Sequence, residues 1–364
     1  MKAPRSRGDQ HNRSTVTLKV LAEHLGLSPG TVSGVLNNSL ASLSIPERTK
    51  KRILAAASEL NYRPNFVARS LRVMRTHMIG VIVEEIGDPY SGMVMSGIEQ
   101  YLRRHGFFFL TVVHRHDPKL LQTDTQLLLE RGVEGLIAVG SSISQPPPLP
   151  AVAVAGHRRM KGVTNLVLDH RLAAQLALKY LIDLDHEEIV FMKGATTSSD
   201  AEDRWKAIVE VCQEMGIRMS RELIIQLQGD EITPELGYTF TKKLLSRRKP
   251  FTALFAYNDN SAIGAIRAIH ETGLRVPEDI SVVGFDDIVF AVFSIPPLTT
   301  VRQPLQKMGE IAARTLLKQM DGSEPYVSEI AVEPEFIVRG STARANKERT
   351  ALHFSGEEKR ERPC

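Results

Sequence analysis

The residues of this chain that could do chemistry do not form a catalytic motif. The sequence contains no GxSxG, HExxH or GxxxxGK[ST] string, and neither Cys212 nor Cys364 is paired with a credible base. His114 and His116 lie two residues apart at the end of a predicted strand, where a metal site is the alternative to two structural histidines. We therefore expect no catalytic residues, no metal and no cofactor, and look for polar residues that bind partners.

The composition is that of a globular protein with a basic N-terminal part. Of the 364 residues, 42% are hydrophobic and 24% are charged, and no apolar run approaches the roughly 18 residues that span a bilayer. The N-terminus lacks the apolar segment of a secretory signal, so we expect a cytoplasmic protein with no membrane partner. Residues 1–78 carry 13 Lys and Arg against 4 Asp and Glu, whereas the remainder carries 33 against 38. This asymmetry predicts a head that binds a polyanion, with a merely solvated basic tail as the alternative.

Three short helices are predicted before residue 63. Thr17 can cap a first helix that ends at Gly26, Ser28 can cap a second, and a third extends from about Glu47 to Leu60. In each of them apolar residues recur at helical spacing, so each helix has one face to bury. Two short helices around a tight turn, supported by a third, are typical of a helix-turn-helix head, although a plain three-helix bundle has the same pattern.

The strings TVSGVLN and NYRPNFVARSL make this interpretation more specific. With their surroundings they resemble the DNA-binding head of the LacI/GalR (lactose-repressor) family, and the resemblance covers about residues 16–342. It implies a bacterial transcription regulator whose second helix lies in the major groove of DNA. The DNA-contacting residues that it implies in the head are Thr17, Ser28, Pro29, Gly30, Thr31, Ser33, Gly34 and Asn37.

The second helix departs from the family where bases are read. The positions that commonly reach base edges in the family hold Pro29, Gly30 and Gly34, and none of these has a side chain that can read a base. Either the polar residues between and after them carry the remaining readout, or the glycines let the backbone approach DNA closely, or the head binds weakly. The stretch between Asn37 and Thr49 is also longer than the usual loop of the family.

Residues 63–77 are predicted to form a hinge helix and a linker. The segment RPNFVARSLR is too short to be a stable helix alone. The resemblance implies that it folds on operator DNA and that Leu71 of each subunit enters the minor groove, with Asn65, Arg69 and Arg72 beside it. A plain linker helix that packs Leu71 inward is the alternative.

From residue 78 onward, short apolar runs alternate with amphipathic helices. Five strand candidates, MIGVIVEE, FFFLTVV, VEGLIAVG, AVAVAG and TNLVLD, precede four more, EIVFMKG, LIIQLQG, TALFAY and ISVVGFD. Strands that are apolar on both faces and separated by helices indicate doubly wound parallel sheets, so the fold class is α/β. Two such halves resemble the type I periplasmic-binding-protein fold that forms the effector-binding core of the family.

Ligands of such folds bind at the carboxyl ends of the strands, here in a cleft between the two halves. The resemblance maps the lining of this cleft onto Asp88, Tyr90, Asp169, Arg204, Asn258 and Asp286. Asp and Asn suit sugar hydroxyls. It is the resemblance to the family that implies a carbohydrate or a related metabolite as the effector. The motif QGDEITP has Glu231 where the family often has an aromatic residue that stacks on the ligand, which leaves the ligand class open.

Structural alternatives exist for several of these residues. Asp259 is expected to cap the helix that follows TALFAY, and Asp287 to cap its own turn. Arg204 could form a surface ion pair instead of binding a ligand.

The predicted organisation is a disordered tail over 1–14, a head over 15–62, a hinge over 63–77, a core over 78–342 and a disordered tail over 343–364. Within the core, the first lobe is expected to hold about 78–168 and 301–322, and the second lobe about 169–300 and 323–342. The C-terminal tail is polar and has no leucine heptads, so it offers no coiled coil for tetramers.

The sequence thus predicts a homodimeric, sequence-specific DNA-binding regulator, most simply a repressor, that binds a pseudo-palindromic operator and responds to a small effector. A solute-binding protein of the same fold would leave the basic head unexplained. An enzyme on this fold is a third alternative, for which no residues present themselves.

Overall fold

The computed structural model describes residues 16–37, 39, 42–63, 70, 74–141, 143, 145–156, 160–195, 199–228, 233–348, 350 and 354. The contacts within the chain divide it into two compact units, Met1–Thr76 and His77–Cys364. The predicted hinge residues Asn65, Arg69, Leu71 and Arg72 lie outside the described residues, as does Glu231. Their roles therefore stay predictions.

The first unit contains the three predicted helices, α1 (Leu18–Leu25), α2 (Pro29–Leu36) and α3 (Glu47–Glu59). The side chain of Thr17 caps α1 and that of Ser28 caps α2, as expected from their types. Leu21, Val32 and Ile53, one from each helix, are completely buried in a shared core. Because α2 holds two glycines and is only 8 residues long, this packing is what stabilises it.

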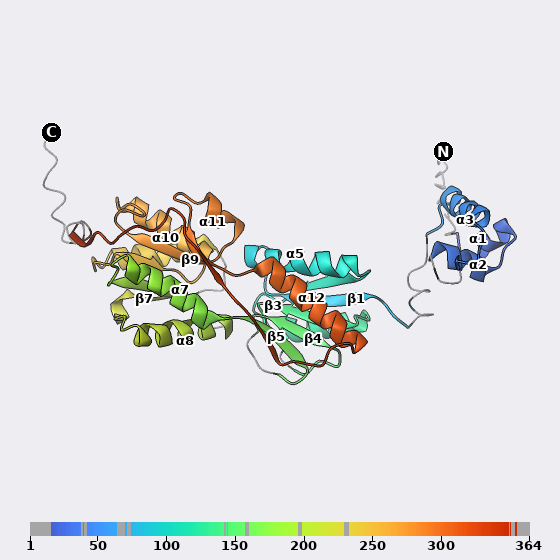
Figure 1. Ribbon diagram of the computed structural model, residues 1–364, viewed down its shortest axis with the longest axis horizontal. Coiled ribbons are helices and arrows are strands. Elements are labelled where there is room, and N and C mark those ends of the chain that lie inside the picture. The colour runs from blue at the N-terminus through green and yellow to red at the C-terminus, as the bar shows by residue number, and fades with distance from the viewer. Residues whose placement is uncertain are drawn as a thin grey trace, which may run out of the picture. The chain divides into compact units, whose positions relative to one another are not determined.

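The second unit contains two six-stranded sheets, each with helices on its faces (Figure 1). The first sheet has the strand order β11-β5-β4-β3-β1-β2, and every pair in it is parallel. Its strands are β1 (Met78–Val83), β2 (Phe108–Val113), β3 (Gly135–Val139), β4 (Ala151–Val154), β5 (Val163–Leu168) and β11 (Glu329–Val332).

The second sheet has the order β12-β10-β9-β8-β6-β7 and is parallel except for the antiparallel edge strand β12. Its strands are β6 (Ile189–Lys193), β7 (Ile224–Gln226), β8 (Ala253–Phe255), β9 (Ser281–Asp286), β10 (Thr299–Arg302) and β12 (Glu335–Ile337). All nine predicted strands are therefore confirmed. Most are apolar runs buried on both faces of the sheet, whereas the edge strand β2 alternates between exposed and half-buried residues.

The helices divide between two lobes, one around each sheet. The first lobe holds α5 (Pro89–Arg104), α6 (Pro118–Glu130) and α12 (Leu305–Asp321), and the second lobe holds α7 (His170–Asp183), α8 (Ser199–Glu214), the short 3₁₀ helix at Arg221–Leu223, α9 (Pro234–Leu245), α10 (Asp259–Glu271) and α11 (Val289–Phe293). In the first lobe α5 and α12 touch backbone to backbone: a Cβ on Gly309 would lie 2.0 Å from the carbonyl oxygen of Val94. Larger residues than glycine would force these helices apart.

The predicted division of the lobes is wrong near the C-terminus. Residues 323–342 were expected in the second lobe, but β11 pairs with β5 in the first sheet. Residues 301 and 302 were expected in the first lobe, but they belong to β10 of the second sheet. The chain thus crosses between the lobes three times, after β5, after β10 and after β11. Two crossings are joined directly, since the amide of Asp169 donates to the carbonyl of Val332 at 2.9 Å.

The expectation of disorder over 343–364 is also wrong for the part that the structure describes. The ring of His186 bonds the carbonyl of Ala343 at 3.0 Å, and the hydroxyl of Thr350 donates to the carbonyl of Asp279 at 3.0 Å. Phe354 is buried in the second lobe, with its ring 5.8 Å from that of Phe251. One aromatic side chain and a few backbone bonds hold a polar segment that has no periodic pattern of its own.

Within the described ranges, no helix is both long enough and apolar enough to cross a membrane.

Candidate ligand site and DNA-binding head

A buried guanidinium forms the centre of the polar residues in the second lobe. Arg204 projects from α8 and is only 4% exposed. Its Nη2 donates to Oδ2 of Asp200 at 2.7 Å, one helical turn earlier, and its Nη1 donates to the carbonyl of Tyr257 at 2.6 Å. The plane lies over the ring of Phe285, 3.7 Å from its centroid. The alternative of a surface ion pair is therefore wrong for Arg204.

Asp286 is the second carboxylate beside this guanidinium. Its Oδ1 lies 3.8 Å from Nη2 of Arg204 and accepts a hydrogen bond from the amide of Gln303 at 2.6 Å. Asp286 ends β9 with φ of 106°, a backbone conformation that non-glycine residues rarely adopt, so the surrounding contacts hold it there. Since Gln303 lies in the crossing between β10 and α12, Asp286 connects the polar residues of the second lobe to a crossing segment.

The first lobe contributes Asp88 and Tyr90. Asp88 is buried and caps α5 by accepting from the amides of Tyr90 at 3.2 Å and Ser91 at 3.3 Å. The hydroxyl of Tyr90 is buried and finds no hydrogen-bond partner among the described residues. It lies close enough to Asp200, Asp286 and Arg204 for their charges to act on it, so the two lobes meet at these residues.

Carboxylates face one another across this contact between the lobes. Burial is the main cause that raises the pKa of Asp88 and raises that of Asp286 well above its usual range. Glu84, at the end of β1, has its pKa raised to about 8, first by burial and then by the charges of Asp88 and Asp200. We call Glu84, Asp88, Tyr90, Asp200, Arg204 and Asp286 the inter-lobe cluster.

The structure brings four of the six predicted ligand residues together and gives the other two structural roles. Asp169 is exposed and caps α7 through Leu172, so it does not join the cluster. Asn258 caps α10 in a capping box with Ser261. The cap was expected at Asp259, which is wrong, since Asp259 is fully buried and bonds instead to Ile288 and Thr300.

Asp287 does not merely cap its own turn. Its two carboxylate oxygens bind Nε of Arg302 at 2.7 Å and Nη2 of Arg339 at 2.7 Å. Asp287 therefore holds the end of the second sheet together next to the inter-lobe cluster.

Sequence reasoning missed Glu84, Asp200 and His170. His170 lies 3.0 Å from Oδ1 of Asp200 and thereby fixes the carboxylate that neutralises Arg204. The spacing of Asp200 and Arg204 by four residues on a helix was a usable signal for an internal ion pair. For Glu84 the signal was a glutamate directly after an apolar strand, at the edge where ligands bind.

His114 and His116 do not meet as metal ligands. Nε2 of His114 bonds the hydroxyl of Ser141 at 2.6 Å, whereas Nδ1 of His116 lies 3.5 Å from Oε1 of Glu84. Among the residues that the structure describes, no group of three or more His, Cys, Asp or Glu is arranged to hold a metal ion.

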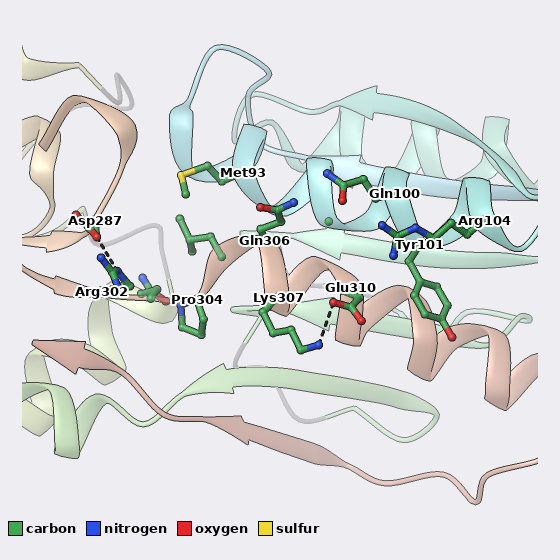
Figure 2. Close-up of a pocket in the computed structure, with 13 residues that line it drawn as sticks. Met93, Gln100, Tyr101, Arg104, Asp287, Arg302, Pro304, Gln306, Lys307 and Glu310 are labelled. Atoms are coloured by element: carbon green, nitrogen blue, oxygen red, sulfur yellow. Dashed lines mark hydrogen bonds and ion pairs between the residues drawn. The ribbon is translucent and has the colours of Figure 1, made fainter. Parts of the chain in front are cut away.

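A separate pocket is lined by residues of α5 and of the start of α12 (Figure 2). Gln303, which donates to Asp286 of the inter-lobe cluster, also lines it. The pocket has a volume of about 420 Å³ and lies where one face of α5 meets the start of α12. Two ion pairs line it, Arg302 with Asp287 at 2.7 Å and Lys307 with Glu310 at 3.0 Å. Apart from Arg104, the charged side chains that line this pocket are thus paired within the protein.

The head places its predicted DNA residues in two groups. Ser28, Pro29 and Gly30 are exposed at the start of α2, Thr31 is half-buried behind them, and Thr17 caps α1. Ser33 and Gly34 are buried in the absence of DNA, so their contact with DNA stays a prediction. Ser39 lies over Gly34, with its amide 3.0 Å from the carbonyl of Gly34, and exposed Asn37 turns its amide back to Ser33 at 2.8 Å. The longer loop therefore covers the position that was expected to face DNA.

Comparison with known proteins agrees with both parts of the chain. Residues 17–65 match the family described as bacterial regulatory proteins, lacI family, and residues 178–342 match the periplasmic binding protein-like domain. The HTH-type transcriptional repressor PurR of Haemophilus influenzae is 32% identical over 338 residues, which cover 89% of this chain and 98% of that protein. The ribose operon repressor of the same species is 31% identical over 331 residues, with the same coverage.

Solved structures resemble the whole arrangement. The lac repressor dimer bound to operator and the anti-inducer ONPF has a TM-score of 0.80 and 26% identity, covering 91% of this chain and all of that one. The complex of the regulator CelR with cellobiose has a TM-score of 0.66 and 26% identity, covering 89% of this chain and 99% of that one. The α/β fold with a helix-turn-helix head and a two-lobed, periplasmic-binding-protein-like core is thereby confirmed.

The raised pKa of Glu84 makes the stability of the protein depend on pH. A carboxyl group whose pKa rises on folding binds its proton more tightly in the folded state, so stability falls as pH rises between the unfolded value of 4.5 and about 8. One such group contributes a slope of at most about 1.4 kcal/mol per pH unit. We expect Glu84→Gln to flatten the decline of Tm between pH 5.5 and 8.5, measured by thermal unfolding.

The neighbouring Glu85 provides the matched control, because it is exposed. Glu85→Gln should keep the slope of the unmodified protein. Equal slopes in all three proteins would contradict the burial of an uncompensated carboxylate at Glu84.

Proposed function

The chain belongs to the lacI family of bacterial regulatory proteins, and from this we propose that it is a transcriptional repressor that binds operator DNA as a homodimer and responds to a small ligand held at the inter-lobe cluster. The DNA site is a pseudo-palindrome, since two identical heads read two half-sites. The protein acts where chromosomal DNA lies, in the bacterial cytoplasm. Its relatives are repressors and not enzymes, in line with a binding function.

One observation carries the proposal: a helix-turn-helix unit is joined to a two-lobed unit that has buried, unpartnered polar groups where its lobes meet. Tyr90 offers its hydroxyl from the first lobe, and Nε of Arg204 is buried without a partner among the described residues of the second. Buried polar groups are rarely left unpaired in native proteins, so these two favour a ligand that bonds to both lobes. A solute-binding protein would use the same cluster but has no use for the head.

The crossing segments can transmit a structural change at the ligand site to the DNA-binding head. A ligand that contacts Asp286 acts on Gln303, which Asp286 bonds at 2.6 Å and which lies in one of the crossings. Rotation of the lobes about the crossings moves the first lobe, whose strand β1 starts directly after the head and hinge. A coupling free energy of about 1–3 kcal/mol is the usual scale for such linkage. The ligand class is best described as a carbohydrate or a related metabolite.

An apolar surface on the second lobe supports the homodimer. Five large apolar side chains in and after α11 are exposed together, namely Val289, Phe290, Val292, Phe293 and Ile295. Contiguous apolar surface of this kind is typical of a protein–protein interface. It directly follows Asp286 and Asp287, so a change at the inter-lobe cluster reaches the dimer surface within a few residues.

The first experiment is selection of DNA from a random pool by the full chain at low and at high salt. We expect a two-fold symmetric site, because a dimer presents two heads, and an affinity that declines with salt as phosphate contacts release counterions. A variant that lacks residues 1–76 should retain the two-lobed unit, which has its own core, and should lose all DNA binding. Enrichment of no sequence, or DNA binding by the truncated chain, would refute the proposed function.

Tyr90→Phe tests the ligand site without disturbing the fold. The lost hydroxyl is buried and has no partner among the described residues, so Tm should stay equal or rise. The effect of ligand on operator affinity should need a ligand concentration about 5–15 times higher, the scale of one lost hydrogen bond. The ligand is first found by screening metabolites for a shift in operator affinity.

Tyr180→Phe is the control, because its hydroxyl bonds Thr342 at 3.0 Å, away from the inter-lobe cluster. That variant should lose stability and keep its ligand response. If Tyr180→Phe weakened the ligand response and Tyr90→Phe did not, the ligand site would lie outside the inter-lobe cluster.

Phe293→Asp tests the dimer surface. Phe293 is 76% exposed, so a monomer loses nothing from the change, whereas a dimer would bury the new charge. We expect monomers by light scattering after size exclusion, and an operator affinity reduced at least tenfold. Leu120→Asp places a charge on an exposed position of α6 and should leave the dimer intact. Dimers of equal stability in Phe293→Asp would exclude this surface.

A further inference from the structure

The carboxylate of Glu84 lies over the carboxyl ends of three strands. It follows β1, and its Oε1 is 3.5 Å from Nδ1 of His116, which follows β2. Its Oε2 is 3.4 Å from where a Cβ on Gly140 would lie, at the end of β3. Glycine at 140 therefore leaves room for the carboxylate, and the side chains of Glu84 and His116 are each only 16% exposed.

Among the described residues, Glu84 has neither a guanidinium nor helix amides as a partner, unlike the other acidic groups of the inter-lobe cluster. Asp200 and Asp286 share the guanidinium of Arg204, and Asp88 accepts from the start of α5. For Glu84, the nearest basic group in the described part of the chain is the ring of His116, at a distance too long for a strong hydrogen bond. The charges of Asp88 and Asp200 act on Glu84 from the two lobes, so the ligand position is acidic on both sides.

The other polar groups of the inter-lobe cluster indicate which hydrogen-bonding atoms a ligand needs. The hydroxyl of Tyr90 and Nε of Arg204 are buried donors without a partner among the described residues. A ligand oxygen, such as a hydroxyl or a ring oxygen, can accept from both. An anionic group could also accept from them, but burial and the neighbouring acidic groups already disfavour negative charge at Glu84, Asp88 and Asp286, and such a ligand would add to that charge.

We propose that the ligand is an amino sugar or a similar polyol with one protonated nitrogen, that Glu84 together with His116 binds this nitrogen, and that phosphorylated or carboxylated analogues are rejected. This inference rests on the proposed function only in placing the ligand at the inter-lobe cluster. Glu84 is thereby the residue that determines specificity for charge, while Tyr90 and Arg204 bind the hydroxyl side of the ligand.

The protonation of Glu84 gives the proposal a second signature. With its pKa raised to about 8, Glu84 holds a proton at pH 6.5 when no ligand is present. A bound ammonium favours the carboxylate and lowers that pKa, so the proton leaves as the ligand binds. A neutral sugar has no such effect. The groups that face Glu84 in this balance are Asp88 before α5, Asp200 on α8 and His116 after β2.

The test uses the full chain and matched sets of sugars. Glucosamine, glucose and glucose 6-phosphate form one set, and the galactose and mannose series form two more. We expect at least one hexosamine to raise Tm saturably and to bind at least ten times more tightly than its parent hexose in calorimetry at pH 6.5. No sugar phosphate should bind. Heats in two buffers of different ionisation enthalpy should show release of about one proton per hexosamine bound.

Glu84→Gln is the decisive variant, with Glu85→Gln as its control. The first should lose the preference for the hexosamine over the hexose and the release of the proton, whereas the second should keep both. Saturable binding of a sugar phosphate, equal binding of a hexose and its hexosamine, or no binding by any hexosamine would overturn the proposal. Selection of a symmetric operator by the same preparation distinguishes these outcomes from failure of the proposed function, which predicts the operator and not the charge of the ligand.

Discussion

The burial of one positive charge organises the second lobe. A guanidinium with 4% exposure is costly unless carboxylates and hydrogen-bond acceptors surround it. Arg204 meets this requirement through three separate elements: Asp200 on its own helix, the carbonyl of Tyr257 after β8, and Asp286 at the end of β9. The ends of the strands are thereby held in a fixed arrangement before any ligand arrives, so the second lobe offers a preorganised half of a binding site.

The first lobe differs from the second in that its charges are not balanced within it. Within the part of the first lobe that the structure describes, Asp88 accepts from helix amides, whereas the basic group beside Glu84 is the imidazole of His116. When the lobes approach each other, the carboxylates of the two sides repel each other more strongly. A ligand that donates hydrogen bonds to them reduces this repulsion. A ligand shifts a conformational equilibrium only through its different affinity for the two states. We propose that this difference arises from charge and that the hydrogen bond that Gln303 donates to Asp286 carries it into a crossing segment.

The sequence predicted the elements with strong local signals and missed those that depend on distant partners. Strands that are apolar on both faces and helices with Ser, Thr, Asp or Asn caps were identified because their patterns are local. The strand β11 alternates between exposed and half-buried residues at a sheet edge and is only four residues long, so nothing local distinguished it from a loop. The segment around Phe354 is ordered by contacts with Phe251 and Asp279, which are distant in sequence.

The same reasoning explains the site. Asp88, Tyr90, Arg204 and Asp286 followed from strand ends and family positions, whereas Asn258 and Asp169 have residue types that serve equally well as helix caps, and this is the role the fold gives them. Glu84 was overlooked because a glutamate after a strand is usually solvated. Its burial depends on Gly140 and His116, which only the register of β1 with β2 and β3 brings beside it.

In the head, the second helix α2 packs against the other two helices, but it exposes few side chains that can read DNA bases. Ser33 and Gly34 are buried, Ser39 lies against Gly34, and exposed Pro29 and Gly30 carry no group that recognises a base edge. What α2 still presents is its exposed amino end at Ser28, Pro29 and Gly30, and the positive end of a helix favours contact with phosphate. We infer that this head is positioned mainly by the DNA backbone, so base specificity must come from residues beyond α2 or from DNA shape.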